Sequence, residues 1–165
     1  MTLAKNGVLS WEELATLPGM PSKERLEQGP VAVIECAQEI PCNPCEEACH
    51  NGAIQVGEPI TNLPVLIADK CTGCGLCIAA CPGQAIFVIN LAYSETEATV
   101  QLPYEFLPLP EKGEIVDGLD REGQKICTAQ VLKVQNPKKF DRTPVITLAV
   151  PKECAMAVRN IALRR

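Results

Sequence analysis

Two stretches of the sequence carry eight of its ten cysteines. One reads Cys71-Thr-Gly-Cys74-Gly-Leu-Cys77-Ile-Ala-Ala-Cys81-Pro82, in which the cysteines are spaced C-x2-C-x2-C-x3-C-P. The other reads Cys36-Ala-Gln-Glu-Ile-Pro-Cys42-Asn-Pro-Cys45-Glu-Glu-Ala-Cys49-His50, with a longer first gap and His in place of Pro. Gaps of two residues let one tight loop present three thiols, and the x3 gap places the fourth about one helical turn further on. Both stretches therefore predict metal-binding loops.

The spacing resembles that of the bacterial two-cluster ferredoxins, whose paired runs bind two [4Fe–4S] clusters. In that family the fourth cysteine of each run binds the cluster of the other run. The resemblance implies a first cluster held by Cys36, Cys42, Cys45 and Cys81, and a second cluster held by Cys71, Cys74, Cys77 and Cys49. Gly73 and Gly75 fit this interpretation, because a loop wrapped around a cluster needs positive-φ positions and N–H groups directed at sulfur.

Two other uses of paired cysteines are the alternatives. Disulfides are disfavoured, because no signal peptide opens the sequence and the spacing is too regular for a secreted disulfide framework. Structural zinc sites also use C-x2-C pairs. They combine two well-separated pairs, however, whereas here three cysteines crowd each loop and a fourth follows closely. Two [4Fe–4S] clusters are therefore the expected cofactors.

Composition narrows the class of protein. The 165 residues suit one ordinary domain or a small domain with an addition, and ten cysteines without a leader indicate a reducing, cytoplasmic compartment. No apolar run approaches the ~20 residues of a membrane span. Residues 36–81 hold five acidic residues against Lys70 alone, in a chain of net charge −5. This acidic centre argues against nucleic acid as a partner and predicts low cluster potentials, because it disfavours an added electron.

An internal repeat accompanies the two cysteine runs. Residues 30–36 match residues 64–71 as an apolar strand that enters a ligand loop, and residues 50–56 match residues 82–88 after the fourth cysteine. Each half therefore reads strand, ligand loop, short helix, strand. The predicted fold class is α+β, with a pseudo-two-fold ferredoxin βαβ–βαβ core over residues 30–92.

Residues 1–29 contain no cysteine and predict a short helical extension. Ser10 and Glu13 have the form of a capping box, and a second short helix is expected over residues 23–28. The apolar residues of this extension are expected to pack on the ferredoxin core, with docking of another subunit as the alternative. They are Trp11, Leu14, Leu17 and Leu26.

The rest of the chain reads as a connector followed by a β-rich module. Residues 93–112 form the expected connector, which includes a strand-like alternation over residues 99–102. Residues 113–165 form the expected small domain, with strands near residues 114–116, 125–134 and 144–150. A helix over residues 153–164 is predicted to close the chain, because apolar residues there lie along one helical stripe. These are Ala155, Val158, Ile161 and Ala162.

The first cysteine run departs from the ferredoxin pattern in ways that affect its cluster. The insertion of residues 37–41 gives Cys36 a longer arm, so we expect a first cluster that is more exposed or that loses an iron more readily. Pro41 and Pro44 remove two N–H donors, which predicts a lower potential for the first cluster. His50, the only histidine, is expected to be a surface residue, with metal ligation or a proton-coupled role as the alternatives.

Cys127 and Cys154 lie outside both runs. Each stands far from any other cysteine in the sequence, and we expect both to serve as small buried apolar residues. A third metal site or a redox pair is the alternative.

The sequence contains no catalytic constellation. It has one histidine and no phosphate-binding, flavin or nicotinamide motif, so the isolated chain is not expected to be an enzyme. Eight cysteine ligands for two clusters leave no iron evidently open to a substrate. One-electron transfer is therefore the expected function.

The flanking residues indicate a subunit of a larger complex, because a two-cluster ferredoxin needs only about 55–60 residues. The run Cys36–Cys45 together with the β-rich tail resembles the small ferredoxin subunits of FAD-dependent amino-acid and amine dehydrogenases, such as heteromeric proline, hydroxyproline, sarcosine and opine dehydrogenases. That resemblance implies a flavoprotein dehydrogenase partner, with room for a further iron–sulfur subunit. A free soluble ferredoxin that shuttles electrons between enzymes is the alternative, and a structural or sensory use of the clusters is a third hypothesis.

Overall fold

The computed structural model describes residues 3–164. The predicted N-terminal extension (residues 1–29) and the predicted C-terminal domain (residues 113–165) therefore each extend slightly beyond the described residues. The predicted order of strand, helix and strand is present in both halves of the repeat. The first half contains β1 (Val31–Ile34), α4 (Pro44–Glu47) and β2 (Ile54–Gln55), and the second contains β3 (Val65–Leu66), η1 (Ala68–Lys70), α5 (Leu76–Ala80) and β4 (Ile86–Asn90). β1 pairs with β4 and β2 with β3, both antiparallel. Each half therefore contributes one strand to each pair.

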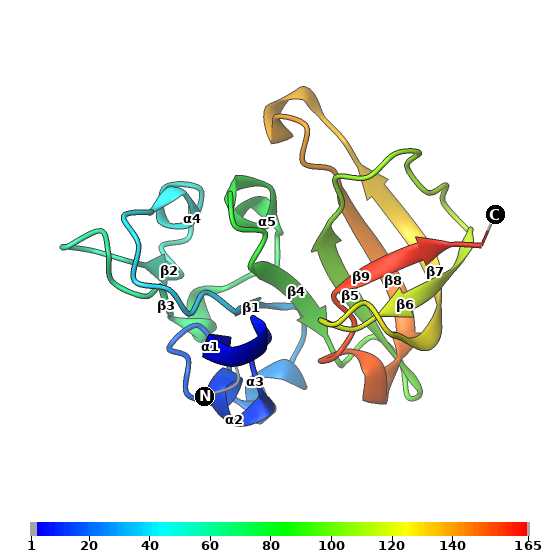
Figure 1. Cartoon of the computed structure of the whole chain (residues 1–165), viewed down its shortest axis with the longest axis horizontal. Helices are drawn as coiled ribbons and strands as arrows, with labels where there is room; N and C mark the ends of the chain where they lie inside the picture. Colours follow the sequence, from blue (N-terminus) through cyan, green and yellow to red (C-terminus); the bar gives the residue numbers. More distant parts are fainter. Residues whose placement is uncertain (1–2, 165) are drawn as a thin grey trace.

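Five further strands extend the sheet that β1 and β4 begin. They are β5 (Glu97–Pro103), β6 (Ile115–Leu119), β7 (Lys125–Gln135), β8 (Val145–Pro151) and β9 (Asn160–Leu163), with η2 (Lys138–Phe140) between β7 and β8. The strand order is β1-β4-β5-β8-β7-β6-β9, and Figure 1 shows β4 leading from the helical half into the β-rich half. β5 lies in the predicted connector, over the stretch where the alternation predicted a strand. The predicted strands of the tail are confirmed as β6, β7 and β8.

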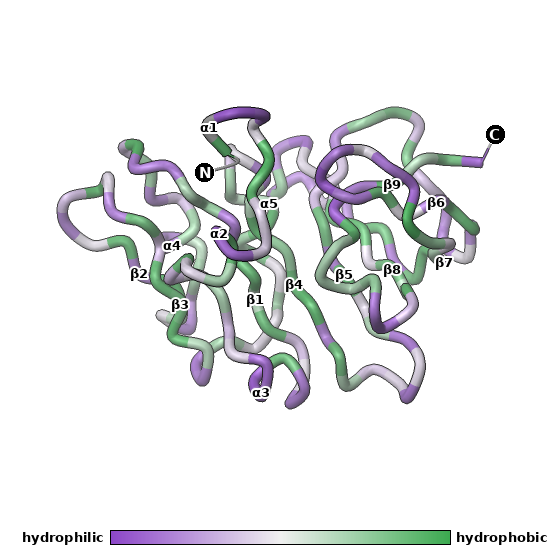
Figure 2. Tube along the Cα trace, turned by 60° about the horizontal axis from the view of Figure 1, so that its bottom comes forward, coloured by the Kyte–Doolittle hydropathy of each residue, from purple (hydrophilic) through white to green (hydrophobic). Residues whose placement is uncertain are grey.

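The sheet has a buried cluster on each face. Alternate residues of β1 and β4 point to opposite faces, so Val31 and Phe87 join the core shared with β5 to β9, while Ala32 and Val88 face the cysteine loops. This burial on both faces explains why β1 and β4 are continuous apolar runs rather than alternating ones. In Figure 2 the most hydrophobic parts of the chain lie along these central strands.

The N-terminal extension forms three short helices, α1 (Leu3–Asn6), α2 (Trp11–Ala15) and α3 (Lys23–Leu26). The capping box at the start of α2 is confirmed, since the side chains of Ser10 and Glu13 each accept a hydrogen bond from the backbone N–H of the other. Leu14 and Leu26 are buried as predicted, but Trp11 is 51% exposed. Among residues 3–164, no helix has the length and apolar character needed to cross a membrane.

The predicted helix over residues 153–164 is wrong. The segment instead contains a single 3₁₀ turn, η3 (Lys152–Cys154), and then β9, which pairs antiparallel with β6. An isolated helix of this length is marginal in water, whereas the free edge of β6 offers a row of backbone hydrogen bonds. Ala155, Val158 and Ile161 are buried, but Ala162 is exposed, so the predicted stripe is right about burial at three of its four positions and wrong about the helix.

Candidate metal centre

Four thiols line one cavity between the two cysteine loops. Three come from the second run, and the fourth, Cys49, comes from the first; the others are Cys71, Cys74 and Cys77. Burial, together with the nearby thiols of the other three residues, raises the pKa of Cys77 to about 12. The structure therefore brings together all four cysteines expected at the second cluster.

The other four thiols gather in the same manner. Burial raises the pKa of Cys45 to about 11, with a contribution from the nearby thiol of Cys81 and smaller ones from Cys42 and Cys36. The pKa of Cys36 is also raised, by burial and then by Cys81 and Cys42. Cys81 of the second run thus lies with the thiols of the first, which is the exchange that the family resemblance implies. Iron ligation by the eight cysteines stays a prediction.

Backbone N–H groups point at three of the sulfur atoms. Ala53 donates to Cys49 Sγ at 3.2 Å, and at the matching position of the second half Ala85 donates to Cys81 Sγ at 3.5 Å. Ala32, on β1, donates to Cys71 Sγ at 3.3 Å. These donors would stabilise negative charge on sulfur, so the protein groups around the cavities suit a thiolate-held cluster. In the described part of the chain, no group of three or more His, Cys, Asp or Glu side chains has the geometry to hold a single metal ion.

The second loop is packed tightly against its surroundings. Gly73 and Gly75 have φ angles of +68° and +78°, which confirms the predicted positive-φ positions. A Cβ atom on Gly73 would lie 2.5 Å from Cβ of Pro30 and 2.9 Å from its backbone, so no side chain fits there. Gln101 of β5 donates to the Gly73 carbonyl at 3.4 Å, which ties the loop to the β-rich half.

Arg25 holds the second loop from the other side. Its guanidinium donates to four backbone carbonyl oxygens, those of Ala68 (3.1 Å), Gly29 (3.3 Å), Pro30 (3.3 Å) and Cys71 (2.8 Å). No feature of the sequence pointed to this residue, because an arginine in a short helix carries no signal of its target. The extension therefore contributes a positive charge next to an expected ligand.

The first loop is longer and depends on other contacts. Cys42 donates its backbone N–H to Ile60 O at 3.0 Å, and the Glu46 carboxylate accepts from Gly57 N–H at 3.2 Å. Among the eight thiols, Cys74 of the second run is the exposed one. The inserted residues are themselves mostly exposed, and greater exposure of the first cluster stays a prediction. His50 is exposed, as predicted.

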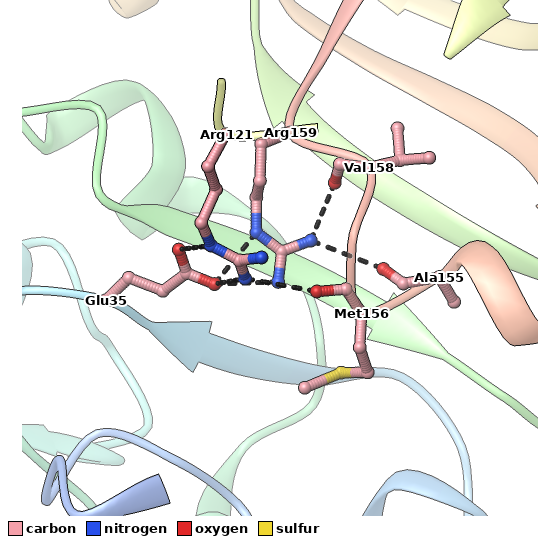
Figure 3. A network of polar contacts seen from close by, with 6 residues as sticks. All are labelled: Glu35, Arg121, Ala155, Met156, Val158 and Arg159. Atoms are coloured by element: carbon pink, nitrogen blue, oxygen red, sulfur yellow. Dashed lines mark hydrogen bonds and ion pairs between the residues drawn. The ribbon is translucent and has the colours of Figure 1, made fainter. Parts of the chain in front are cut away.

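A charged network lies beside the first loop. Glu35 directly precedes Cys36, and its carboxylate accepts from Arg121 Nε at 2.9 Å and Nη2 at 2.5 Å, and from Arg159 Nε at 2.8 Å. Nη2 of Arg159 lies 2.7 Å from the same carboxylate. Figure 3 shows the two guanidinium groups converging on the one carboxylate. No sequence signal predicted this contact, which joins residues more than eighty positions apart.

The network is buried and keeps its charge. The side chains of Glu35 and Arg159 are only 8% and 5% exposed. Burial acts to raise the pKa of Glu35, but hydrogen bonds from Arg121 and the charge of Arg159 outweigh it, so the pKa lies below its usual value. Burial lowers the pKa of Arg159 to about 10 against the opposing effect of Glu35, which leaves Arg159 protonated at neutral pH.

Cys127 and Cys154 meet in the structure although they are distant in sequence. Burial, followed by the effect of the nearby Cys154 thiol, raises the pKa of Cys127 to about 12. Both are half-buried rather than fully buried. A thiol with this pKa is a poor nucleophile at neutral pH, and Glu153 and Asp117 nearby make its surroundings more negative.

Comparison with known proteins places residues 40–85 in the 4Fe–4S dicluster domain family. The matched segment contains seven of the eight cysteines of the two runs and leaves out Cys36. The chain is 45% identical over 47 residues to one subunit of an ion-translocating oxidoreductase complex from Methanosarcina acetivorans, which is 28% of this chain and 17% of that protein. No solved structure matches the chain significantly.

Two further relatives match part of the chain. An uncharacterized ferredoxin of Methanocaldococcus jannaschii is 34% identical over 61 residues, covering 37% of this chain and 36% of that protein. The polyferredoxin-like subunit of an aliphatic sulfonate oxidoreductase from Pyrococcus furiosus is 38% identical over 55 residues, covering 33% of this chain and 29% of that protein. The matches thus span about a third or less of these relatives. Residues 40–85 carry a 4Fe–4S dicluster domain related to ferredoxins and to ferredoxin-like subunits of oxidoreductase complexes.

Proposed function

We propose that this chain is an iron–sulfur subunit that passes single electrons through two [4Fe–4S] clusters, to or from a flavoprotein dehydrogenase. The observation that carries the proposal is the exchange of cysteines between the runs. Cys81 lies with the thiols of the first run and Cys49 with those of the second, as two adjacent clusters require. We assign residues 31–90, with their repeated strand–helix–strand order, to a two-cluster ferredoxin core in an α+β chain.

The eight thiols divide into two ligand sets in this proposal. When bound, each cluster supplies a one-electron redox couple. Cys36, Cys42, Cys45 and Cys81 would hold the first, and Cys71, Cys74, Cys77 and Cys49 the second. The thiols must lose their protons to bind iron, and the raised pKa values of Cys45 and Cys77 mean that assembly depends on pH.

The space between the two sites suits electron transfer between them. α4 and α5 contact each other, and each leads into the cysteine that crosses to the other site. Cys45 and Cys77 lie in one buried cluster with Ile34, Ile54 and Ile78. This apolar packing excludes water from the path and holds the thiols in fixed positions.

A partner subunit accounts for the parts of the chain outside the ferredoxin repeat. Two of the relatives are named as subunits of oxidoreductase complexes, and the first cysteine run with the β-rich tail resembles the ferredoxin subunits of FAD-dependent dehydrogenases. Trp11, Phe106 and Leu107 are large apolar side chains that stay 51%, 60% and 87% exposed, which suits subunit contacts. Ten free cysteines suit the reducing cytoplasm.

Anaerobic purification of the native protein tests this proposal. We expect about eight irons and eight acid-labile sulfides per chain, reversible reduction seen by EPR, and a co-eluting polypeptide with flavin absorbance. Intact clusters in a chain that elutes alone would instead indicate a free ferredoxin that shuttles electrons. Zinc, or too little iron for two cubanes, would overturn the cluster assignment, and clusters that cannot be reduced reversibly would indicate a structural use.

A further inference from the structure

A surplus positive charge is buried beside the first cysteine run. Glu35 contributes one negative charge, and Arg121 and Arg159 contribute two positive charges within 3 Å of its carboxylate. Cys36 follows Glu35 directly, and the three charged residues line the same hollow as Cys36. Asp120 and Glu122 also line this hollow, but Asp120 is half-buried and Glu122 is exposed, so water screens their charges more. Among residues 3–164, the second run has no comparable buried ion network. Arg25 is half-buried and bound to neutral carbonyl groups, and Lys70, which precedes Cys71, is exposed.

The two arginines are held firmly in place. Arg121 comes from the turn between β6 and β7 and also donates to Met156 O at 3.0 Å. Arg159 directly precedes β9 and donates to the carbonyls of Val158 (2.6 Å) and Ala155 (3.3 Å). Their guanidinium carbons lie 4.9 Å and 4.5 Å from the ring centroids of Trp11 and Phe87. The charges therefore cannot swing away when a neighbouring group changes its own charge.

We propose that Arg121 and Arg159 raise the reduction potential of the first cluster, so that the β-rich half of the chain sets the order in which the two clusters are reduced. The inference rests on the proposed function. Reduction adds one negative charge to a cluster, and a fixed positive charge nearby favours that addition. Burial keeps this effect strong, because surrounding water and salt screen it little.

This effect opposes the one expected from the first loop itself. Pro41 and Pro44 remove N–H donors and lower the potential of the first cluster. The structure adds the buried cations, which act on the potential in the opposite direction. A unit charge that acts over ~10 Å at an effective dielectric constant of ~20 changes an equilibrium about tenfold, which is large enough to offset missing hydrogen bonds. We therefore expect the potential of the first cluster to fall when the arginines are neutralised.

Redox titration of the full chain, followed by EPR, tests the inference. The wave of the first cluster is identified in Cys77→Ser, which removes the second cluster. In Arg121→Gln we expect the reduced-to-oxidised ratio of the first cluster at fixed potential to fall about tenfold, or 59 mV, while the second wave stays in place. Glu35→Gln removes the opposing charge and should shift the first wave upward.

The potential is expected to shift downward in Arg121→Gln and upward in Glu35→Gln. These opposite directions distinguish an electrostatic effect from a structural effect of losing the ion pair. Both substitutions break the same ion pair, so a purely structural role would move the potential in the same direction in both. Arg121→Lys keeps the charge and should keep the potential, even where it lowers thermal stability. Lys125→Gln removes a cation from the exposed pair with Asp117 in the neighbouring strand and should leave both waves unchanged.

The outcomes also separate this inference from the proposed function. Lack of iron and sulfide in the unchanged protein would remove the clusters themselves. Two intact, reversible clusters whose first wave does not move in Arg121→Gln, or moves the same way in Glu35→Gln, would overturn the inference alone. Where Arg121→Gln fails to retain its clusters, Arg121→Lys and Glu35→Gln carry the test: an unchanged potential in the first and an upward shift in the second support it, and any other result overturns it.

Discussion

The two cysteine loops share the spacing of their last three cysteines but are held in different ways. The second loop is short and glycine-rich, and its backbone is fixed by Arg25 and Gln101. The first loop is longer and proline-rich, and its fixed neighbours are charges: Glu35 at its entrance, with Arg121 and Arg159 behind it. One loop is therefore specified by backbone fit and the other by buried electrostatics.

This difference shows how one motif can serve two unequal sites. In the second loop, an added side chain should be the most destabilising change around the ligands, because Gly73 has no room for one. In the first loop a change of charge should matter most, because the surrounding ion network is nearly closed to water. Substitutions in each loop test this difference, and the loss of a ligand should have a larger effect than any change around it.

Loss of single cysteines should have the largest effect and should cross between the loops. Cys77→Ser is expected to remove the second cluster and spare the first, whereas Cys81→Ser is expected to remove the first, because Cys81 lies with Cys45 and Cys36. Each variant should retain about four of the eight irons. EPR and iron analysis measure this, and loss of the same signal in both variants would disprove the crossed assignment.

Gly73→Ala should destabilise the second loop by about 3 kcal/mol. The αL backbone costs a side-chain-bearing residue ~1–2 kcal/mol, and the overlap with Pro30 adds roughly as much again. Gly52→Ala is the matched control, since Gly52 has a φ of +60° but no atom within 4 Å of where a Cβ would lie; it should cost only about 1 kcal/mol. Anaerobic urea unfolding measures both, and equal losses would contradict the packing argument.

Arg25→Gln should weaken the second loop without touching a thiol. Four carbonyl groups lose a charged donor, which we expect to lower the free energy of unfolding by about 2 kcal/mol. The second cluster should also be lost faster to a chelator than the first. Lys23→Gln, on the exposed face of the same helix, serves as the control. A chelation rate that rises equally for both clusters would show that Arg25 acts on the whole fold.

Gln84→Gly should produce the smallest effect, a gain of about 1 kcal/mol. Gln84 has a φ of +52°, and the matching position in the first half is Gly52. Glycine removes the energetic cost of the left-handed backbone. It also loses more conformational entropy on folding than glutamine, which cancels part of the gain in stability. The neighbouring change Gly83→Ala, at a glycine without positive φ or close contacts, should be nearly neutral. Destabilisation in Gln84→Gly would show that its side chain has a role that the repeat hides.

The repeat and the cysteine spacing predicted the strands and helices of residues 31–90 well. Strand, loop and helix there follow from local signals: apolar runs before Cys36 and Cys71, and glycines at positions that need positive φ. These signals lie within a few residues of the element that they specify. Iron ligation, the number of clusters and the partner stay predictions.

Contacts between distant segments could not be predicted from the sequence. Arg25, Gln101 and the pair Arg121 and Arg159 reach targets tens of residues away, and no local pattern marks a long side chain's partner. The final segment was mispredicted for the same reason. The edge of β6, not the apolar stripe of residues 153–164, decided that β9 would be a strand.

Because β4 and β5 belong to one continuous sheet, the N-terminal half of the chain cannot be cut out without exposing a strand edge. A fragment that ends at residue 92 keeps every cysteine of the two runs and the pairing of β4 with β1, but it loses the second partner of β4, since residues 88–90 pair with residues 99–101 of β5. The bare backbone of β4 would then be an open template for strands from other molecules. β5 therefore covers the edge of β4, and a stable fragment without β5 would need charged residues or proline along that edge.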